Sequence, residues 1–199
     1  MFPFLPFFLI FLIWLAYRIK KATGSRQKKI DAFWQKERDA DLVPPKDLGT
    51  LSYITIPLDT FPIGEVYDPE VELIEEELRQ LSIGRMLNLS GMLNADIKTE
   101  YGAANLDAVA AMGDRFERMT LLLVDYAKAL LEAGRVDGAI TVLEYGRSVG
   151  SDISSNYTLL GDCYHEAGEG EKLASLISDV EGSELPRKQH ILEYLRSLV

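Results

Sequence analysis

The sequence of 199 residues carries 31 acidic and 21 basic side chains, a net charge of −10, and a single cysteine. Six of the basic residues and none of the acidic residues lie in the first 30 positions, so the rest of the chain has a net charge of −16. An acidic surface of this kind disfavours nucleic-acid binding, which needs clustered Lys and Arg, and the lone Cys163 excludes an internal disulfide or a multi-cysteine zinc site.

The chain opens with the uncharged stretch MFPFLPFFLIFLIWLAY, which is followed by a basic cluster. A secretory signal carries its basic residues before the apolar run, whereas here Arg18, Lys20 and Lys21 follow it, so no cleavage is expected. The run is close to the roughly 20 residues of a typical membrane-spanning helix, and residues 1–21 are predicted to form a transmembrane anchor. A buried soluble helix is the alternative. Since basic flanks stay inside, we expect a single-pass protein of the cell membrane with a cytoplasmic domain.

Residues 22–68 are predicted to form a juxtamembrane helix, to about residue 42, and then an extended connector. Ile30, Phe33 and Trp34 recur at helical spacing as a small apolar patch, which we expect to dock on the chain's own body, with the membrane surface or a partner as alternatives. In VPPKDLGTLSYITIPLDTFPIG the four prolines prevent a continuous helix, and the large apolar residues favour packing over disorder. The connector residues expected to pack along the helical body are Leu51, Tyr53, Ile54, Ile56, Leu58 and Phe61.

A helical domain is predicted over residues 69–199. Asp68 and Pro69 form a helix start, an N-cap followed by a first-turn proline. The acidic run of residues 75–77 is predicted to be a solvated face, since no convergent ligands suggest a metal site. The segment LNLSGMLNADIKTEYGAAN is predicted to be an irregular joint, and helices follow it. The fold class is therefore predicted to be all-α.

An internal repeat appears when YAKALLEAGRVDGAITVLEYG is aligned with LGDCYHEAGEGEKLASLISDV. The offset between the two segments, about 34 residues, is the period of one helix–turn–helix repeat class. The aligned pairs are Ala127 with Gly161, Ala133 with Ala167, Gly134 with Gly168, and Leu143 with Ile177.

These residues resemble the tetratricopeptide repeat, in which small residues allow two antiparallel helices to cross closely and a glycine lies in the turn between them. The resemblance implies an α-α superhelical array with repeat units at about residues 120–153 and 154–186 and a capping helix at 187–199. Leu173 departs from the pattern because the family prefers alanine there. More loosely, the layout looks like that of membrane-anchored tetratricopeptide-type proteins of Gram-positive bacteria, a likeness that carries no known activity.

No enzymatic activity, cofactor or metal is predicted. Cys163 and His165 are two residues apart and so point about 200° from each other around a helix, which prevents a thiol–base pair. The fragment GEGEK lacks the spacing of a phosphate-binding loop and a preceding strand.

The predicted function is that of a membrane-anchored protein–protein interaction scaffold, with a helical groove facing the cytoplasm. Carrying over the register of the repeat gives a mostly acidic concave face, which predicts a protein or peptide partner with a basic segment; an ordinary solvated helix face is the alternative. The predicted concave-face residues are Asp125, Lys128, Glu132, Asp162, His165 and Glu166. The second hypothesis is a structural subunit of a membrane complex or homo-oligomer, with the groove filled by the chain's own residues 46–64.

Overall fold

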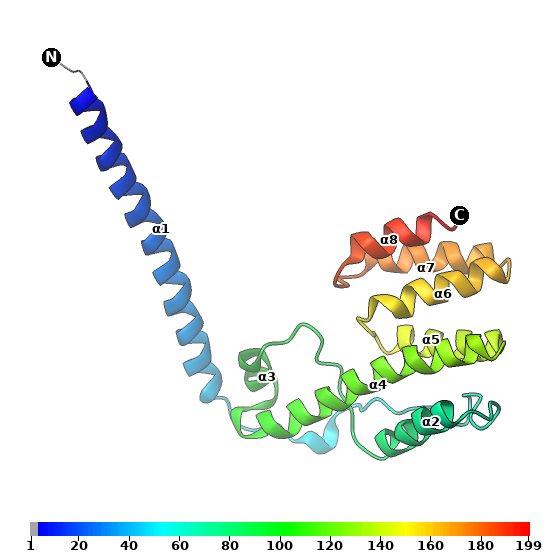
Figure 1. Ribbon diagram of the computed structural model, residues 1–199. Coiled ribbons are helices and arrows are strands. Elements are labelled where there is room, and N and C mark those ends of the chain that lie inside the picture. The colour runs from blue at the N-terminus through cyan, green and yellow to red at the C-terminus, as the bar shows by residue number, and fades with distance from the viewer. Residues whose placement is uncertain (1–3) are drawn as a thin grey trace. The chain divides into compact units, whose positions relative to one another are not determined.

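The computed structural model describes the backbone of residues 4–199, and the side chains of that range except those of residues 4, 5, 19 and 21–25. Residues 1–3 of the predicted anchor and the side chain of Lys21 lie outside the described part. Within it the chain forms eight α-helices and two short 3-10 helices and no β-strand, so the predicted all-α fold is confirmed (Figure 1). The 3-10 helices are η1 (Leu48–Thr50) and η2 (Ala103–Asn105). The chain divides into an amino-terminal unit, Met1–Leu48 with Met92–Leu106, and a carboxy-terminal unit, Gly49–Gly91 with Asp107–Val199.

The amino-terminal unit consists mainly of α1 (Phe4–Asp41) and α3 (Asn94–Tyr101), which pack against each other. The predicted continuation of the first helix to about residue 42 is confirmed. Lys98 holds the two helices together, because its ammonium group contacts Glu37 at 3.0 Å and Asp41 at 2.8 Å on α1. These two hydrogen bonds, with that to Asp41 the larger, raise the pKa of Lys98.

Helix α3 corrects the prediction of an irregular joint in this region. The helix is short, but Asp96 in its first turn accepts a hydrogen bond from the backbone N–H of Leu93 at 2.9 Å, which stabilises its start. The helix ends at Gly102, where φ is +88° and a Cβ atom would lie 2.5 Å from the carbonyl oxygen of Pro44. Only glycine fits that combination of backbone conformation and close approach.

Helix α2 (Pro69–Ser82) begins where the sequence predicts. The Asp68 carboxylate accepts hydrogen bonds from the backbone N–H groups of Glu70 at 2.8 Å and Val71 at 3.4 Å, as an N-cap residue does. The prediction of a solvated acidic face is wrong for Glu75, which is only 2% exposed. One carboxylate of the acidic run is therefore part of the interior.

The internal repeat of the sequence is also present in the helix boundaries of the last five α-helices, of which the first takes part with its end only. They are α4 (Leu106–Glu132), α5 (Val136–Ser148), α6 (Ser154–Glu166), α7 (Gly170–Gly182) and α8 (Lys188–Arg196). The offset that aligns Ala127 with Gly161 also separates equivalent helix ends. It separates the starts of α5 and α7 and the starts of α6 and α8, and it separates the ends of α4 and α6 and the ends of α5 and α7. Successive helices from α5 to α8 pack against one another (Figure 1).

The turns between paired helices also repeat. At the end of α4, Gly134 has φ +73° and the N–H of Arg135 donates to the carbonyl of Leu130 at 2.7 Å; at the end of α6, Gly168 has φ +71° and the N–H of Glu169 donates to Tyr164 at 2.8 Å. Both ends are Schellman-type caps, which favour glycine in the left-handed conformation. The matched glycines of the sequence alignment therefore terminate equivalent helices.

The connector packs on the carboxy-terminal unit through four of the six predicted residues, and the half-buried Leu51 and Tyr53 are not part of this core. Ile56 and Phe61 are buried members of the apolar core, and Ile54 and Leu58 are partly buried against it. The phenol of Tyr145 on α5 donates to the carbonyl of Thr55 at 2.8 Å, and its ring makes an edge contact with Phe61 at 5.5 Å between centroids. These contacts hold the connector beside α5. The prediction of an extended connector is correct only in part, because η1 lies within it and hydrogen-bonded turns follow at residues 57–60 and 62–65.

Candidate functional site

The predicted concave-face residues lie on the first helix of each pair. Asp125, Lys128 and Glu132 are on α4 and are all exposed. Asp125 and Lys128 form an ion pair at 3.0 Å within one turn of the helix. An exposed pair of this kind contributes little to stability, so both charges stay accessible to a partner.

The second set lies on α6 in the same register. His165 and Glu166 are exposed, whereas Asp162 is half-buried because the phenol of Tyr194 on α8 donates to its carboxylate at 2.8 Å. That hydrogen bond raises the pKa of Tyr194. Tyr194 is not among the predicted residues, since the spacing within one helix gives no information on which side chain of α8 reaches α6.

Glu132 and Glu166 occupy equivalent positions, because each is the last residue of the first helix in its pair. The exposed face of α4 extends further than predicted, through Asp114, Glu117 and Leu121, which recur at steps of three and four residues. Acidic side chains therefore predominate along this face, with Leu121 as its apolar member.

A buried carboxylate ties the connector to the helices that carry this face. Glu75 on α2 accepts hydrogen bonds from the backbone N–H of Gly64 at 2.9 and 3.0 Å and from the phenol of Tyr126 on α4 at 3.0 Å, and Arg79 lies 3.2 Å away. Burial and the hydrogen bond to Glu75 raise the pKa of Tyr126. The connector is thus held against α2, α4 and α5, and the exposed residues Asp125, Lys128 and Glu132 are not covered by it.

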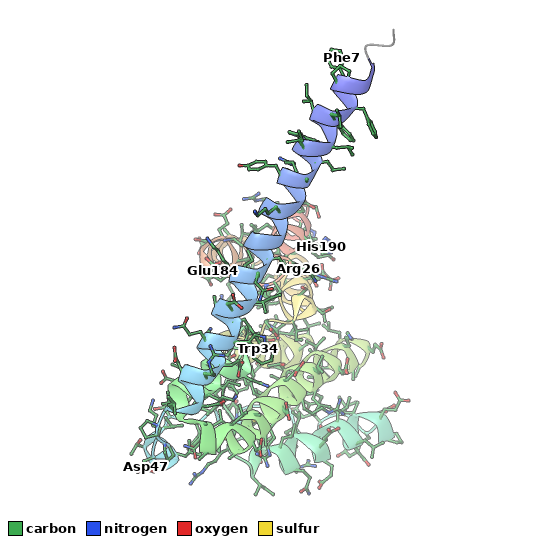
Figure 2. All side chains as sticks on the ribbon, turned by 90° about the vertical axis from the view of Figure 1, so that its left-hand side faces the viewer. Phe7, Arg26, Trp34, Asp47, Glu184 and His190 are labelled. Carbon is green, nitrogen blue, oxygen red and sulfur yellow. The ribbon has the colours of Figure 1, made fainter. Side chains whose placement is uncertain are left out.

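The residues considered for catalysis do not form a reactive cluster. Cys163 is 1% exposed, and burial raises its pKa to about 11, so the thiol is protonated at neutral pH. His165 and His190 are both exposed, and Figure 2 shows His190 at the surface of the molecule. Among the described residues no group of His, Cys, Asp and Glu could hold a metal ion.

The apolar side chains of α1 are exposed along its first part. From Phe7 to Leu15 the large hydrophobic residues are all exposed, and Figure 2 shows their side chains projecting on all sides of the helix. Ile30, Phe33 and Trp34 are also exposed, and the two aromatic rings meet edge to face with centroids 5.4 Å apart. In the described range, however, no helix has the length and apolar character that crossing a membrane requires.

Comparison of the chain with protein-family models, with curated proteins and with solved structures finds no match.

Proposed function

We propose that this protein is a membrane-anchored binding module, whose paired helices form a tetratricopeptide-like array that binds a basic segment of a partner protein. The observation that carries the proposal is the exposed acidic face of α4 and α6, with Glu132 and Glu166 at repeat-equivalent positions. A helical array that presents like charges at such positions suits an extended partner of opposite charge, because each repeat can contact the next part of it.

The anchor in this proposal is the apolar start of α1. Its large Phe, Leu and Ile side chains are exposed in the described part of the helix, and a set of exposed basic residues follows them along the same helix. Basic side chains at this position hold the flank of an anchor on the cytoplasmic side and attract anionic lipid headgroups. The basic residues with described side chains are Arg18, Lys20, Arg26, Lys28 and Lys29.

The alternative is a structural subunit of a membrane complex or homo-oligomer. The hydrogen bond between Tyr194 and Asp162 favours it, since α8 then occupies part of the face that α6 would offer to a partner. In this alternative the array packs against a permanent neighbour, and no dissociable basic segment is needed.

Affinity capture of the full chain from detergent-solubilised membranes distinguishes the two proposals. Glu132→Lys with Glu166→Lys reverses both equivalent charges, and the binding module predicts a several-fold loss of captured basic partner with unchanged stability. The matched control is Asp137→Lys with Glu171→Lys, which reverses exposed charges at equivalent positions on α5 and α7. If both pairs leave every captured protein unchanged, the acidic-face proposal is wrong and the structural subunit replaces it.

The membrane orientation has a separate test. A membrane-impermeant thiol reagent added to intact cells should not label Cys163, but should label it after lysis and mild unfolding, because the thiol is buried. The cytoplasmic assignment would be contradicted if the reagent labelled Cys163 in intact cells, under unfolding conditions that leave the membrane sealed.

A further inference from the structure

A cavity of about 660 Å³ lies in the carboxy-terminal unit, away from the predicted concave-face residues. Its walls come from the loop at Ser90, the turn that joins α5 to α6, and the loop that joins α7 to α8. None of the six predicted partner-binding residues lines it. The lining residues are Ser90, Gly91, Arg147, Ser148, Gly150, Asp152, Tyr157, Asp179, Ser183, Glu184, Leu185 and Pro186.

The charges of this cavity do not balance. Its one basic lining residue, Arg147, is paired with Asp179 at 2.7 Å across α5 and α7. Asp152 and Glu184 lie on opposite loops of the cavity and have no ion-pair partner among its lining residues, so the lining has a net charge of −2. The nearby ammonium group of Lys188 donates to the carbonyl of Ser183 at 2.9 Å and keeps its positive charge, and an excess of one negative charge remains when Lys188 is counted.

The helix ends add to the negative potential. Ser148 is the last residue of α5 and Ser183 follows α7, so the carbonyl ends of both helices meet the cavity. Partial negative charge accumulates at helix carboxyl ends and favours cations there. The side-chain amide of Asn88 already donates to the carbonyls of Val149 and Gly150 at 3.1 and 2.9 Å, and Lys188 donates to that of Ser183. This part of the molecule therefore binds donors and cations within its own chain.

The remaining walls determine what kind of cation fits. Tyr157, Leu185 and Pro186 supply apolar surface, which suits the aliphatic stem of a long side chain. A metal ion does not fit, since within the described residues no three His, Cys, Asp or Glu side chains lie together as metal ligands. We infer that this cavity binds a lysine or arginine side chain of a basic partner segment, with Asp152 and Glu184 contacting the cationic group and the apolar walls contacting its stem. The inference rests on the proposed function, because it places part of the basic partner in a second site.

Fluorescence anisotropy with a fluorescein-labelled hexalysine amide tests this inference on the full chain in nonionic detergent at low salt. Asp152→Asn with Glu184→Gln removes both carboxylates and should raise the Kd for the peptide about five-fold, as expected for two partly exposed charge pairs. Asp137→Asn with Glu171→Gln is the control for net charge, and should change the Kd by less than about two-fold because these residues lie outside the cavity.

A third pair separates this inference from the proposed function. Glu132→Gln with Glu166→Gln removes charge from the predicted concave face only. If this pair raises the Kd for hexalysine and Asp152→Asn with Glu184→Gln does not, the proposed function is supported and the cavity site is overturned. The inference is also overturned if native protein does not bind hexalysine, or if the charge control weakens binding as much as the cavity pair. Circular dichroism of each variant verifies that the helices are intact.

Discussion

Removal of the buried carboxylate of Glu75 should destabilise the carboxy-terminal unit strongly. In Glu75→Ala the fully buried phenol of Tyr126 and the N–H of Gly64 both lose their acceptor. A buried donor left without a partner costs about 1–3 kcal/mol, while the more exposed Gly64 can recover part of its loss from water. Together with the small cavity left by the side chain, the free energy of unfolding should fall by about 3 kcal/mol.

Two matched variants isolate this effect from the loss of a negative charge. Glu76→Ala removes the neighbouring carboxylate, whose side chain is 56% exposed, and should cost less than about 1 kcal/mol. Tyr126→Phe removes the other partner of the hydrogen bond. If the two groups interact as the 3.0 Å distance indicates, the double variant Glu75→Ala with Tyr126→Phe should be more stable than the sum of the single effects by about 1–2 kcal/mol.

Urea denaturation followed by far-ultraviolet circular dichroism measures these differences. The two tryptophans are both in α1, so their fluorescence would not report on the unit that contains Glu75. A cost for Glu75→Ala no larger than that for Glu76→Ala, or a coupling energy near zero, would refute the reasoning.

Burial in the same unit gives three more expected outcomes. Gly161→Leu should lower the free energy of unfolding by about 1–3 kcal/mol or more, because even a Cβ at Gly161 would clash with Leu195. Gly170→Ala is the control, and it should be neutral or stabilising because its Cβ meets no neighbouring atom. Equal melting temperatures of the two variants would contradict this prediction. Burial raises the pKa of Cys163 to about 11, so at pH 8 a thiol reagent should label this residue only when the carboxy-terminal unit unfolds in urea, at the rate of that unfolding. Immediate labelling in native buffer would contradict this prediction. Burial raises the pKa of Tyr145 to about 12, above the value near 10 of the unfolded chain, so the phenol contributes fully to stability below pH 10 and this contribution is lost as the pH rises from 10 to 12. An ultraviolet titration in which all nine tyrosines of the folded protein ionise near pH 10 would exclude this raised pKa.

The features that the sequence predicted well are local. The Asp68–Pro69 helix start and the glycine turns at Gly134 and Gly168 depend on residues within one turn of each other, and the internal repeat places each helix of a pair at the same offset. The helix start and the glycine turns depend on the backbone conformations of a few neighbouring residues, and these conformations can be predicted from the types of those residues.

The features that it missed depend on distant residues. Glu75 is buried because Gly64 and Tyr126, the latter 51 residues away, supply hydrogen-bond donors, and a run of three glutamates gives no indication of this. Helix α3 was missed because it is short, and its packing on α1 joins positions about 60 residues apart. The cavity and the contact of Tyr194 with Asp162 likewise depend on where α8 lies, so the partial burial of Asp162 could not be predicted from periodicity alone.

The glycine at position 161 of the second repeat has a packing explanation. Leu173 stands where the repeat family prefers alanine, and Gly161 stands where the first pair has Ala127. In the structure a Cβ at Gly161 would face Leu195 and Leu173, while the equivalent positions one repeat earlier are Ala127, Gly161 and Ala139. The first crossing therefore combines small residues throughout, and the second combines a glycine with two leucines. Since a close-packed interior tolerates a change of volume only when a neighbour compensates for it, glycine at position 161 makes room for Leu195 and Leu198, whereas Leu173 would lie in ordinary van der Waals contact, 3.7 Å from a Cβ there. Leu195 of α8 fills the space that the missing side chain of Gly161 leaves.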